Sequence, residues 1–272
     1  MVTHSRAQIT DLLTRHGLKP SRALGQNFVV DANTVRRVAR LAEVGPGNFV
    51  LEIGAGLGSL TLALVETGAT VEALEVERYL LAALDEVVAP LGVVVHHVDA
   101  LRADYDTILT GRNTVIVANL PYNVATPLIM HLLEHVPLVK RLLVMVQYEV
   151  GERLAARAGD EAYGAASVRV QYFAEARVVG KVPPTVFVPK PHVDSALVAI
   201  TRRDRVLIDP SVVSDEALFE VVRTTFAQRR KMLRRSLAEW ASEGVFERAG
   251  VDATRRPEEL TIEEFASLAA AR

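Results

Sequence analysis

Between Asn48 and about Arg202, short apolar runs alternate with longer amphipathic stretches. The runs are rich in β-branched residues and predict strands over FVLEI (49–53), TVEAL (70–74), VVVHHV (93–98), TVIVAN (114–119), RLLVMVQ (141–147) and ALVAI (196–200). The stretches between them predict helices over residues 59–67, 78–88, 126–135 and 149–158. Apolar strands separated by single helices are typical of a parallel sheet with helices on both faces. The sequence therefore predicts a doubly wound, Rossmann-like α/β fold.

The strand pattern stops after TRRDRVLIDP (201–210), and the residues beyond it have helical spacing up to Arg272. Turn signals interrupt this spacing at Glu243-Gly244 and Arg256-Pro257. We therefore expect two domains. Residues 1–203 form the α/β domain, with a basic N-terminal arm over about residues 1–40, and residues 204–272 form a small all-helical domain.

The composition narrows the classes of function. Half of the residues are apolar and 24% are charged, which favours a folded protein over a disordered one. The absence of cysteine excludes disulfides, thiolate nucleophiles and cysteine-bound zinc or iron–sulfur centres. No apolar run approaches the roughly 18–20 residues that span a bilayer, and the first residues lack a secretory apolar core. We expect a cytoplasmic protein with no membrane partner.

Charge is segregated along the chain although its net value is only −2. Residues 41–110 hold 11 acidic and 2 basic side chains, whereas residues 1–40 hold 7 basic and 2 acidic ones. Residues 221–235 hold six basic side chains and no acidic one. Basic clusters attract polyanions such as nucleic acid, and a solvated helix face is the alternative explanation.

The first predicted strand runs into LEIGAGLGSLTLAL, where Glu52, Gly54, Gly56 and Gly58 alternate before a helix. Glycines let the backbone approach a ligand closely and turn into a helix N-terminus. A dinucleotide-binding fingerprint needs the spacing G-x-G-x-x-G, but the third glycine here comes one residue early. The loop is also acidic, so it would repel the pyrophosphate of a dinucleotide. A cofactor without phosphate that carries a sulfonium and an ammonium group fits better, and S-adenosylmethionine is such a molecule. A turn without a ligand is the alternative.

Acidic residues also follow the next two strands. Glu75 ends the second strand, where a carboxylate can accept hydrogen bonds from both hydroxyls of an adenosine ribose. This feature indicates an adenosine cofactor but does not distinguish one adenosine cofactor from another. We interpret neighbouring Glu77 as a solvated acid in the first turn of a helix. Asp99 follows the third strand and could accept from an adenine amine, with a structural N-cap as the alternative.

The fourth strand ends in Asn119-Leu120-Pro121-Tyr122, the most specific signal in the chain. An amine conjugated to a ring is a poor nucleophile because its lone pair is delocalised. The Asn119 amide oxygen and the Leu120 carbonyl could accept its two N–H groups and draw them out of the ring plane, while Tyr122 offers a face on which a flipped base can stack. No general base is required, so catalysis is mainly positioning. The alternative is an ordinary Asn-x-Pro turn.

Together with these motifs, LGQNF (24–28), VDA (98–100), YGAASVRVQYF (163–173), VPPTVFVPKPHVDSA (182–196) and FAQRRKML (226–233) occur in order over about residues 15–240. The chain thereby resembles the KsgA/RsmA family of small-subunit ribosomal RNA adenine dimethyltransferases. The resemblance implies a class I methyltransferase fold. It also implies transfer of two methyl groups to each of two adjacent adenosines in the hairpin near the 3′ end of 16S rRNA, linked to small-subunit biogenesis.

The resemblance assigns roles residue by residue. It implies that the cofactor is held by Gln26, Asn27, Val29, Gly54, Gly56, Glu75, Asp99 and Asn119. It places the target amine at Asn119 and the target adenine between Tyr122 and Phe187. The partners it implies are the small ribosomal subunit and its rRNA, and we expect a monomer.

Alternative functions come from other classes. The macrolide-resistance methyltransferases of large-subunit rRNA share GQNF-like and Asn-x-Pro-Tyr elements, but Leu120 and the YGAASVRVQYF stretch favour the small-subunit enzyme. An assembly factor whose binding role outweighs catalysis is a second alternative. The segment HLLEH (131–135) fits an inverted zinc-protease motif. However, it lies on a short predicted helix with no third carboxylate ligand at a suitable spacing, so we interpret it as structural and expect no metal site.

The basic run predicts the RNA contact. On one continuous helix, Arg230 would lie one turn from Arg234 and Lys231 one turn from Arg235, so the run would line one face. The predicted RNA-binding residues are Arg229, Arg230, Lys231, Arg234 and Arg235.

Overall fold

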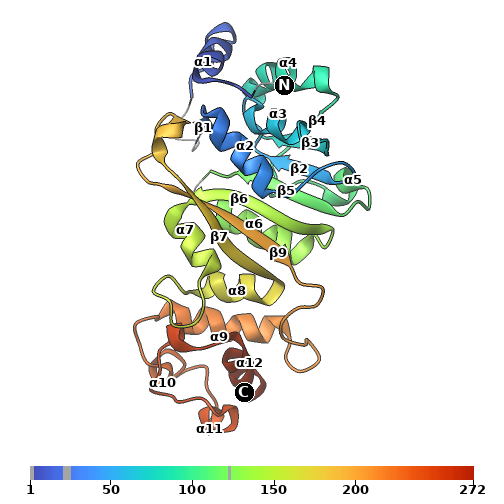
Figure 1. Cartoon of the computed structure of the whole chain (residues 1–272). Helices are drawn as coiled ribbons and strands as arrows, with labels where there is room; N and C mark the ends of the chain where they lie inside the picture. The colour runs from blue at the N-terminus through green and yellow to red at the C-terminus, as the bar shows by residue number, and fades with distance from the viewer. Residues whose placement is uncertain (1–2, 21–25, 122–123) are drawn as a thin grey trace. The chain divides into compact units, whose positions relative to one another are not determined.

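The computed structural model describes residues 3–20, 26–121 and 124–272, and the chain divides into two compact units (Figure 1). One unit contains Met1–Gly151 and Arg177–Thr201, and the other contains Glu152–Ala176 and Arg202–Arg272. The chain passes between the units near residues 151, 176 and 201, and the predicted boundary at residue 203 lies beside the last of these points. Residues 152–176, which the sequence had assigned to the α/β domain, belong to the second unit.

A seven-stranded sheet with the order β4-β3-β2-β5-β6-β9-β7 forms the first unit's framework. Its strands are β2 (Phe49–Ile53), β3 (Thr70–Glu75), β4 (Val94–His97), β5 (Thr114–Asn119), β6 (Val139–Gln147), β7 (Ala174–Val182) and β9 (Ser195–Arg202). Neighbouring strands from β4 to β6 are parallel. All six strands expected from the sequence are present, and the Rossmann-like α/β fold is confirmed.

The far edge of the sheet departs from the prediction. β9 is antiparallel to β6, with Arg141 opposite Thr201, so the predicted parallel arrangement holds from β4 to β6 and does not extend to β9. Parallel neighbours need a long crossover, usually a helix, but β9 follows β7 after residues 183–194, which hold only a 3-10 turn and the short strand β8 (Phe187–Val188). The sequence also missed β7 itself, because charged residues interrupt AEARVVGKV and no continuous apolar run marks it.

Helices follow the parallel strands, as the alternating pattern predicted. The predicted helices are α3 (Ser59–Val65), the 3-10 turn η1 (Arg78–Leu80) with α4 (Leu81–Val88), α6 (Ala125–His135) and α7 (Tyr148–Ala155). Two helices were not predicted: α5 (Tyr105–Leu109) between β4 and β5, and α2 (Ala32–Leu41), which precedes β2. All five residues of β2 are buried, which explains why four of them are apolar; the exception is Glu52. A buried cluster that includes Val50, Val117 and Leu143 of the sheet also contains residues of α2, α3 and α4, which therefore pack on this core.

The N-terminal helix α1 (Arg6–Arg15) packs against the part of the chain that follows β2 and β3. Ile9 and Leu12 share a buried cluster with Leu57 and Leu80. Arg15 Nη1 lies 2.7 Å from a carboxylate oxygen of Glu86, which also lies 2.7 Å from His16 Nε2. Part of the basic arm is therefore paired with the acidic module, the segment over residues 41–110 that holds 11 acidic and 2 basic side chains.

The second unit is helical in the part that follows residue 203, as predicted. Its helices are α8 (Ala165–Phe173), α9 (Asp215–Ala227), α10 (Leu233–Ser236), α11 (Val245–Ala249) and α12 (Ile262–Ala270). Their core includes the edge-on pair Tyr172 and Phe219, with ring centroids 5.2 Å apart, and buried Phe265 and Trp240. None of the helices formed by the described residues has the length and apolar character needed to cross a bilayer.

The basic run is not one helix, so the predicted one-turn spacing of Arg230 and Arg234 is wrong. α9 ends at Ala227, residues 228–232 form a turn, and α10 begins at Leu233. The chain turns because the N–H groups of Leu233 and Arg234 donate to the carbonyls of Arg255 and Ala253, at 2.8 and 3.0 Å. These bonds hold the start of α10 on the segment before α12.

Candidate functional site

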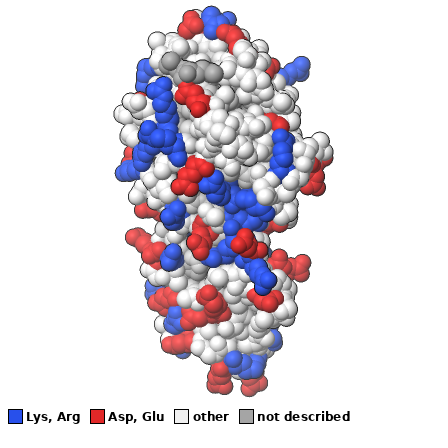
Figure 2. Space-filling model, turned by 45° about the vertical axis from the view of Figure 1, so that its right-hand side comes forward, with Lys and Arg blue, Asp and Glu red and all other residues white. Residues whose placement is uncertain are grey.

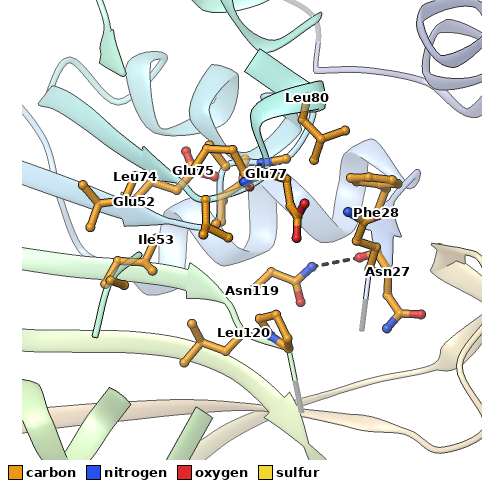
Figure 3. Close-up of a pocket in the computed structure, with 18 of the residues that line it drawn as sticks. Asn27, Phe28, Glu52, Ile53, Leu74, Glu75, Glu77, Leu80, Asn119 and Leu120 are labelled. Carbon is orange, nitrogen blue, oxygen red and sulfur yellow. Dashed lines mark hydrogen bonds between the residues drawn. The ribbon is translucent and has the colours of Figure 1, made fainter. Parts of the chain in front are cut away.

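A cavity of about 340 Å³ lies at the carboxyl ends of β2, β3 and β5, within the first unit (Figure 3). Ligands of doubly wound sheets bind at this edge, and the volume lies in the range of small-molecule sites. The cavity lining includes all the residues predicted to hold the cofactor, namely Gln26, Asn27, Val29, Gly54, Gly56, Glu75, Asp99 and Asn119, and it includes Leu120 as well. The structure therefore brings together residues from five separate segments of the chain, and their individual roles stay predictions.

The glycine loop between β2 and α3 requires glycine for two physical reasons. Gly58 has a φ of 78° and forms the N-cap of α3, a conformation that other residues rarely adopt. Gly56 has a φ of 60°, and a Cβ atom there would lie 3.0 Å from the Phe28 ring. Phe28 thus packs directly on the loop backbone.

Glu75 is fixed at the end of β3 by two backbone donors. Its Oε1 accepts from Glu77 N at 2.9 Å, and its Oε2 accepts from Gly56 N at 2.8 Å. Burial raises the pKa of the Glu75 carboxyl, and these two N–H groups oppose that shift. A carboxylate oxygen has two acceptor sites, so each oxygen can still accept a further hydrogen bond, as a pair of ribose hydroxyls requires.

The cavity is acidic. Its described lining contains Glu52, Glu75, Glu77 and Asp99 and no Lys, Arg or His. The sequence predicted Glu77 to be a solvated acid, but the structure places it in the cavity lining, partly buried. Such a lining suits a cationic ligand and disfavours a pyrophosphate.

Glu52 is the least solvated of these acids. Its side chain is 1% exposed, and within the described part of the chain its Oε2 has no hydrogen-bond partner. Burial raises the pKa of Glu52 to about 8; the nearby Thr61 hydroxyl opposes this shift and the charge of Glu75 adds to it. A buried carboxyl beside a cavity for a cation is available to pair with positive charge.

Asp99 serves the turn after β4 and also faces the cavity. Its Oδ1 accepts from Leu101 N at 2.9 Å within a turn. The helix N-cap considered as the alternative role is not present, because the next helix, α5, is capped by Asp104. The carboxylate is exposed and belongs to the lining, which leaves acceptor sites for an adenine amine. The two roles are compatible.

Asn119 ends β5, and its side chain is oriented by a residue far away in the sequence. Its Nδ2 donates to the Asn27 carbonyl at 2.9 Å, and Figure 3 shows the amide oxygen turned away from that carbonyl. The next residue is tied to the sheet, because Leu120 N donates to the Met145 carbonyl at 3.0 Å. Tyr122, the predicted stacking partner of the base, lies outside the described residues.

Phe187 does not lie at the cavity in this structure. Its side chain is 2% exposed within the core cluster, and it stands opposite Val29 in the antiparallel pairing of β1 (Phe28–Val29) with β8. The described cavity lining does not include it. The pairing of β8 with β1 thus accompanies a Phe187 side chain that packs into the core cluster and not along the cavity.

Some cavity residues were missed by the sequence reasoning. Phe28 belongs to LGQNF but received no role, although its ring covers Gly56. Val76 and Leu80 follow β3, and no local signal distinguishes them from ordinary apolar residues. Only the proximity of loops from different strands identifies them.

The HLLEH segment lies on α6, where the His131 and His135 ring centroids are 5.2 Å apart. Over residues 3–20, 26–121 and 124–272, no group of three or more His, Asp or Glu side chains is arranged to hold a metal ion.

The predicted RNA-binding residues differ in accessibility. Arg230, Lys231, Arg234 and Arg235 are exposed. Arg229 is half-buried and donates to the Glu161 carbonyl, with Glu258 3.9 Å away, so it braces the second unit. Figure 2 shows Lys and Arg gathered in patches among acidic side chains on the face drawn, rather than a uniformly basic surface.

Comparison with known proteins gives consistent results. The family model described as "Ribosomal RNA adenine dimethylase" matches residues 17–271. A Thermobifida fusca protein named "Ribosomal RNA small subunit methyltransferase A" is 45% identical over 274 residues, covering 97% of this chain and 94% of that protein. A protein of the same name from Moorella thermoacetica is 45% identical over 272 residues, covering 94% of each chain.

Solved structures share the fold. A dimethyladenosine transferase from Plasmodium falciparum aligns with a TM-score of 0.74 at 23% identity, covering 88% of this chain and 94% of that one. The 23S rRNA methyltransferase ErmE aligns with a TM-score of 0.71 at 25% identity, covering 90% of this chain and 99% of that one.

Proposed function

This chain belongs to the ribosomal RNA adenine dimethylase family, and we propose that it dimethylates two adjacent adenosines in the 3′-terminal hairpin of 16S rRNA with S-adenosylmethionine. One observation of the site carries the proposal: Asn119 presents an amide oxygen next to an acidic cavity built by the glycine loop and Glu75. An acceptor for an amine beside a site for a cationic methyl donor is what this reaction needs.

The cavity residues fit S-adenosylmethionine. Glu75 has acceptor sites left for the two ribose hydroxyls, and Asp99 can accept from the adenine amine. Buried Glu52 can ionise to pair with the cationic part when the cofactor binds. The lining has no basic side chain among the described residues, which agrees with a cofactor that has no phosphate. When bound, the cofactor supplies a methyl group on a positively charged sulfur.

The chain's own contribution to the chemistry is positioning. The Asn119 Oδ1 and the Leu120 carbonyl accept the two N–H groups of the target amine and draw them out of the ring plane, which returns the lone pair to nitrogen. With the cofactor bound, this lone pair would take up the methyl group as the bond between methyl carbon and positively charged sulfur breaks, and the methylated nitrogen would then release one proton to water. The singly methylated amine must bind again for the second transfer. It has one N–H group left, so it donates to only one of the two acceptors in that step.

We further propose that the first unit carries catalysis and that the helical unit contributes to rRNA binding. The exposed basic residues Arg230, Lys231, Arg234 and Arg235 support this division, whereas Arg229 serves mainly to hold its own unit together. Phosphate contacts of this kind supply affinity rather than sequence choice.

The choice of small-subunit rRNA is supported by the relatives at 45% identity over almost the whole chain, against 25% for the 23S rRNA enzyme. The test is tritiated-methyl transfer from S-adenosylmethionine to small subunits that lack the modification, with large subunits in parallel and the RNA site mapped afterwards. We expect dimethylated adenosine at two adjacent positions of the small-subunit RNA. Methylation of large subunits alone would overturn the proposal.

A further inference from the structure

Residues 26–29 contact three of the loops that surround the cavity. Gln26 Nε2 donates to the Tyr79 hydroxyl on η1. The Asn27 carbonyl accepts from Asn119, and the Phe28 ring packs on Gly56 of the glycine loop. One short segment therefore touches the loops after β2, β3 and β5.

The same segment is anchored on its other side. Phe28 and Val29 pair with β8, and Val30 N donates to the Val186 carbonyl at 2.8 Å. Val29 is buried in the core cluster that also contains Phe187. With contacts on both sides, the position of the Asn27 carbonyl is fixed relative to the end of β5.

The hydrogen bond from Asn119 to this carbonyl selects one orientation of the amide. An asparagine amide has an oxygen that only accepts and a nitrogen that only donates. Facing a carbonyl oxygen, the nitrogen makes a bond, whereas the flipped amide would place two acceptors against each other. The oxygen of Asn119 must therefore point away from Asn27, as Figure 3 shows.

This orientation matters for the proposed reaction. The target amine has N–H groups to donate, so it needs the Asn119 oxygen and gains nothing from its NH₂ group. A flipped amide would present donors to a donor and would leave the amine conjugated with its ring. The carbonyl of Asn27 thus decides whether Asn119 can act.

We propose that residues 26–29 are the positioning element for Asn119, with the Asn27 carbonyl fixing the amide and the Tyr79–Gln26 and Phe28–Gly56 contacts holding that carbonyl in place. The inference rests on the proposed methyl transfer and adds a role for Tyr79, which does not belong to the described cavity lining. Tyr79 acts through Gln26 and is a positioning residue.

The kinetic test is a double-mutant cycle with Tyr79→Phe and Gln26→Ala, in which Tyr79→Phe removes only a hydroxyl. Single-turnover methyl transfer is measured at saturating S-adenosylmethionine with unmodified small subunits. We expect Tyr79→Phe to slow the step about five- to tenfold, with the affinity for subunits unchanged. The double variant should be no slower than Gln26→Ala alone, because both changes break the same contact. Val94→Ala, at a position on β4 that is 51% exposed, is the matched control and should keep the wild-type rate.

The second readout observes Asn119 directly. Its side-chain ¹⁵N amide signals are assigned by their absence from the spectrum of Asn119→Ala. We expect slow exchange and a downfield shift for one Nδ2 proton in the wild type and in Val94→Ala, and loss of both properties in Tyr79→Phe and Phe28→Ala. Additive rate losses in the cycle, or an unchanged Asn119 amide in both variants, would overturn the inference. If wild-type protein transfers no methyl group to subunits, the proposed function fails, whereas the amide spectra still report on residues 26–29.

Discussion

Glu52 should make the binding of S-adenosylmethionine depend on pH, and Glu52→Gln should remove that contribution. The carboxyl lines the cavity, is 1% exposed, and has a pKa raised by burial to about 8. In the free protein it therefore carries a proton at neutral pH. A bound cation favours the ionised form, so binding releases this proton.

The magnitude follows from the pKa. A carboxyl with a pKa of about 8 is about ten parts protonated to one part ionised at pH 7, and about a hundred to one at pH 6. Relative to Glu52→Gln, the wild type should therefore gain in affinity by about tenfold from pH 6 to pH 7 and about fivefold from pH 7 to pH 8, and the gain should level off above pH 8.

The same pKa shift affects stability with a definite sign. The folded protein holds a proton that the unfolded chain, with an ordinary carboxyl pKa of 4.5, has already released. The free energy of unfolding of the free protein should therefore fall as the pH rises from about 4.5 to about 8, by up to about 1.4 kcal/mol per pH unit. Glu52→Gln should lack this decline.

Calorimetry at pH 6, 7 and 8, in two buffers with different ionisation heats, measures both the affinity and the protons released. Wild-type protein should release about one proton more than Glu52→Gln near pH 7. Asp85→Asn is the matched control, because it removes one exposed charge from the acidic module outside the cavity and should keep the wild-type slope. Equal pH slopes in wild type and Glu52→Gln would refute the reasoning.

Three further predictions concern the cofactor, the chemistry and the RNA. Glu75→Ala should weaken S-adenosylmethionine binding by about 1–3 kcal/mol, measured by calorimetry, because hydroxyl partners lose a buried acceptor; wild-type affinity would contradict the assignment. Asn119→Ala should abolish methyl transfer while subunit binding stays near wild type, and substantial turnover would disprove its role. Arg230→Glu with Arg234→Glu should weaken subunit binding and lower its salt slope by about 2, with unchanged cofactor affinity and melting temperature; an unchanged slope would mean that these residues are only a solvated surface.

The sequence by itself predicted the features that depend on near neighbours along the chain. The bounds of strands β2 and β5 match the predicted runs to the residue, because a strand buried on both faces is rich in apolar side chains at successive positions. The glycine loop was equally visible, since a sharp turn into α3 needs a residue that accepts positive φ. From these elements the carboxyl ends of the strands, and with them the candidate site, could be located.

The sequence did not reveal the edge of the sheet or the path of the basic run. β7 pairs at an edge and carries charged residues, so its pairing depends on β9 being present beside it. The helix over the basic run is interrupted because Leu233 and Arg234 bond to carbonyls about twenty residues away. Helical spacing alone contains no information about such partners.

Only the tertiary structure decided how the site is oriented. Asn119 is held by a carbonyl 92 positions earlier in the chain, and Arg229 is committed to a carbonyl 68 positions earlier. Phe187 is turned into the core by its pairing with Val29. Periodicity and turn chemistry act over a few residues, whereas the direction of an amide, the burial of a ring and the pKa of Glu52 depend on which distant segments pack around them.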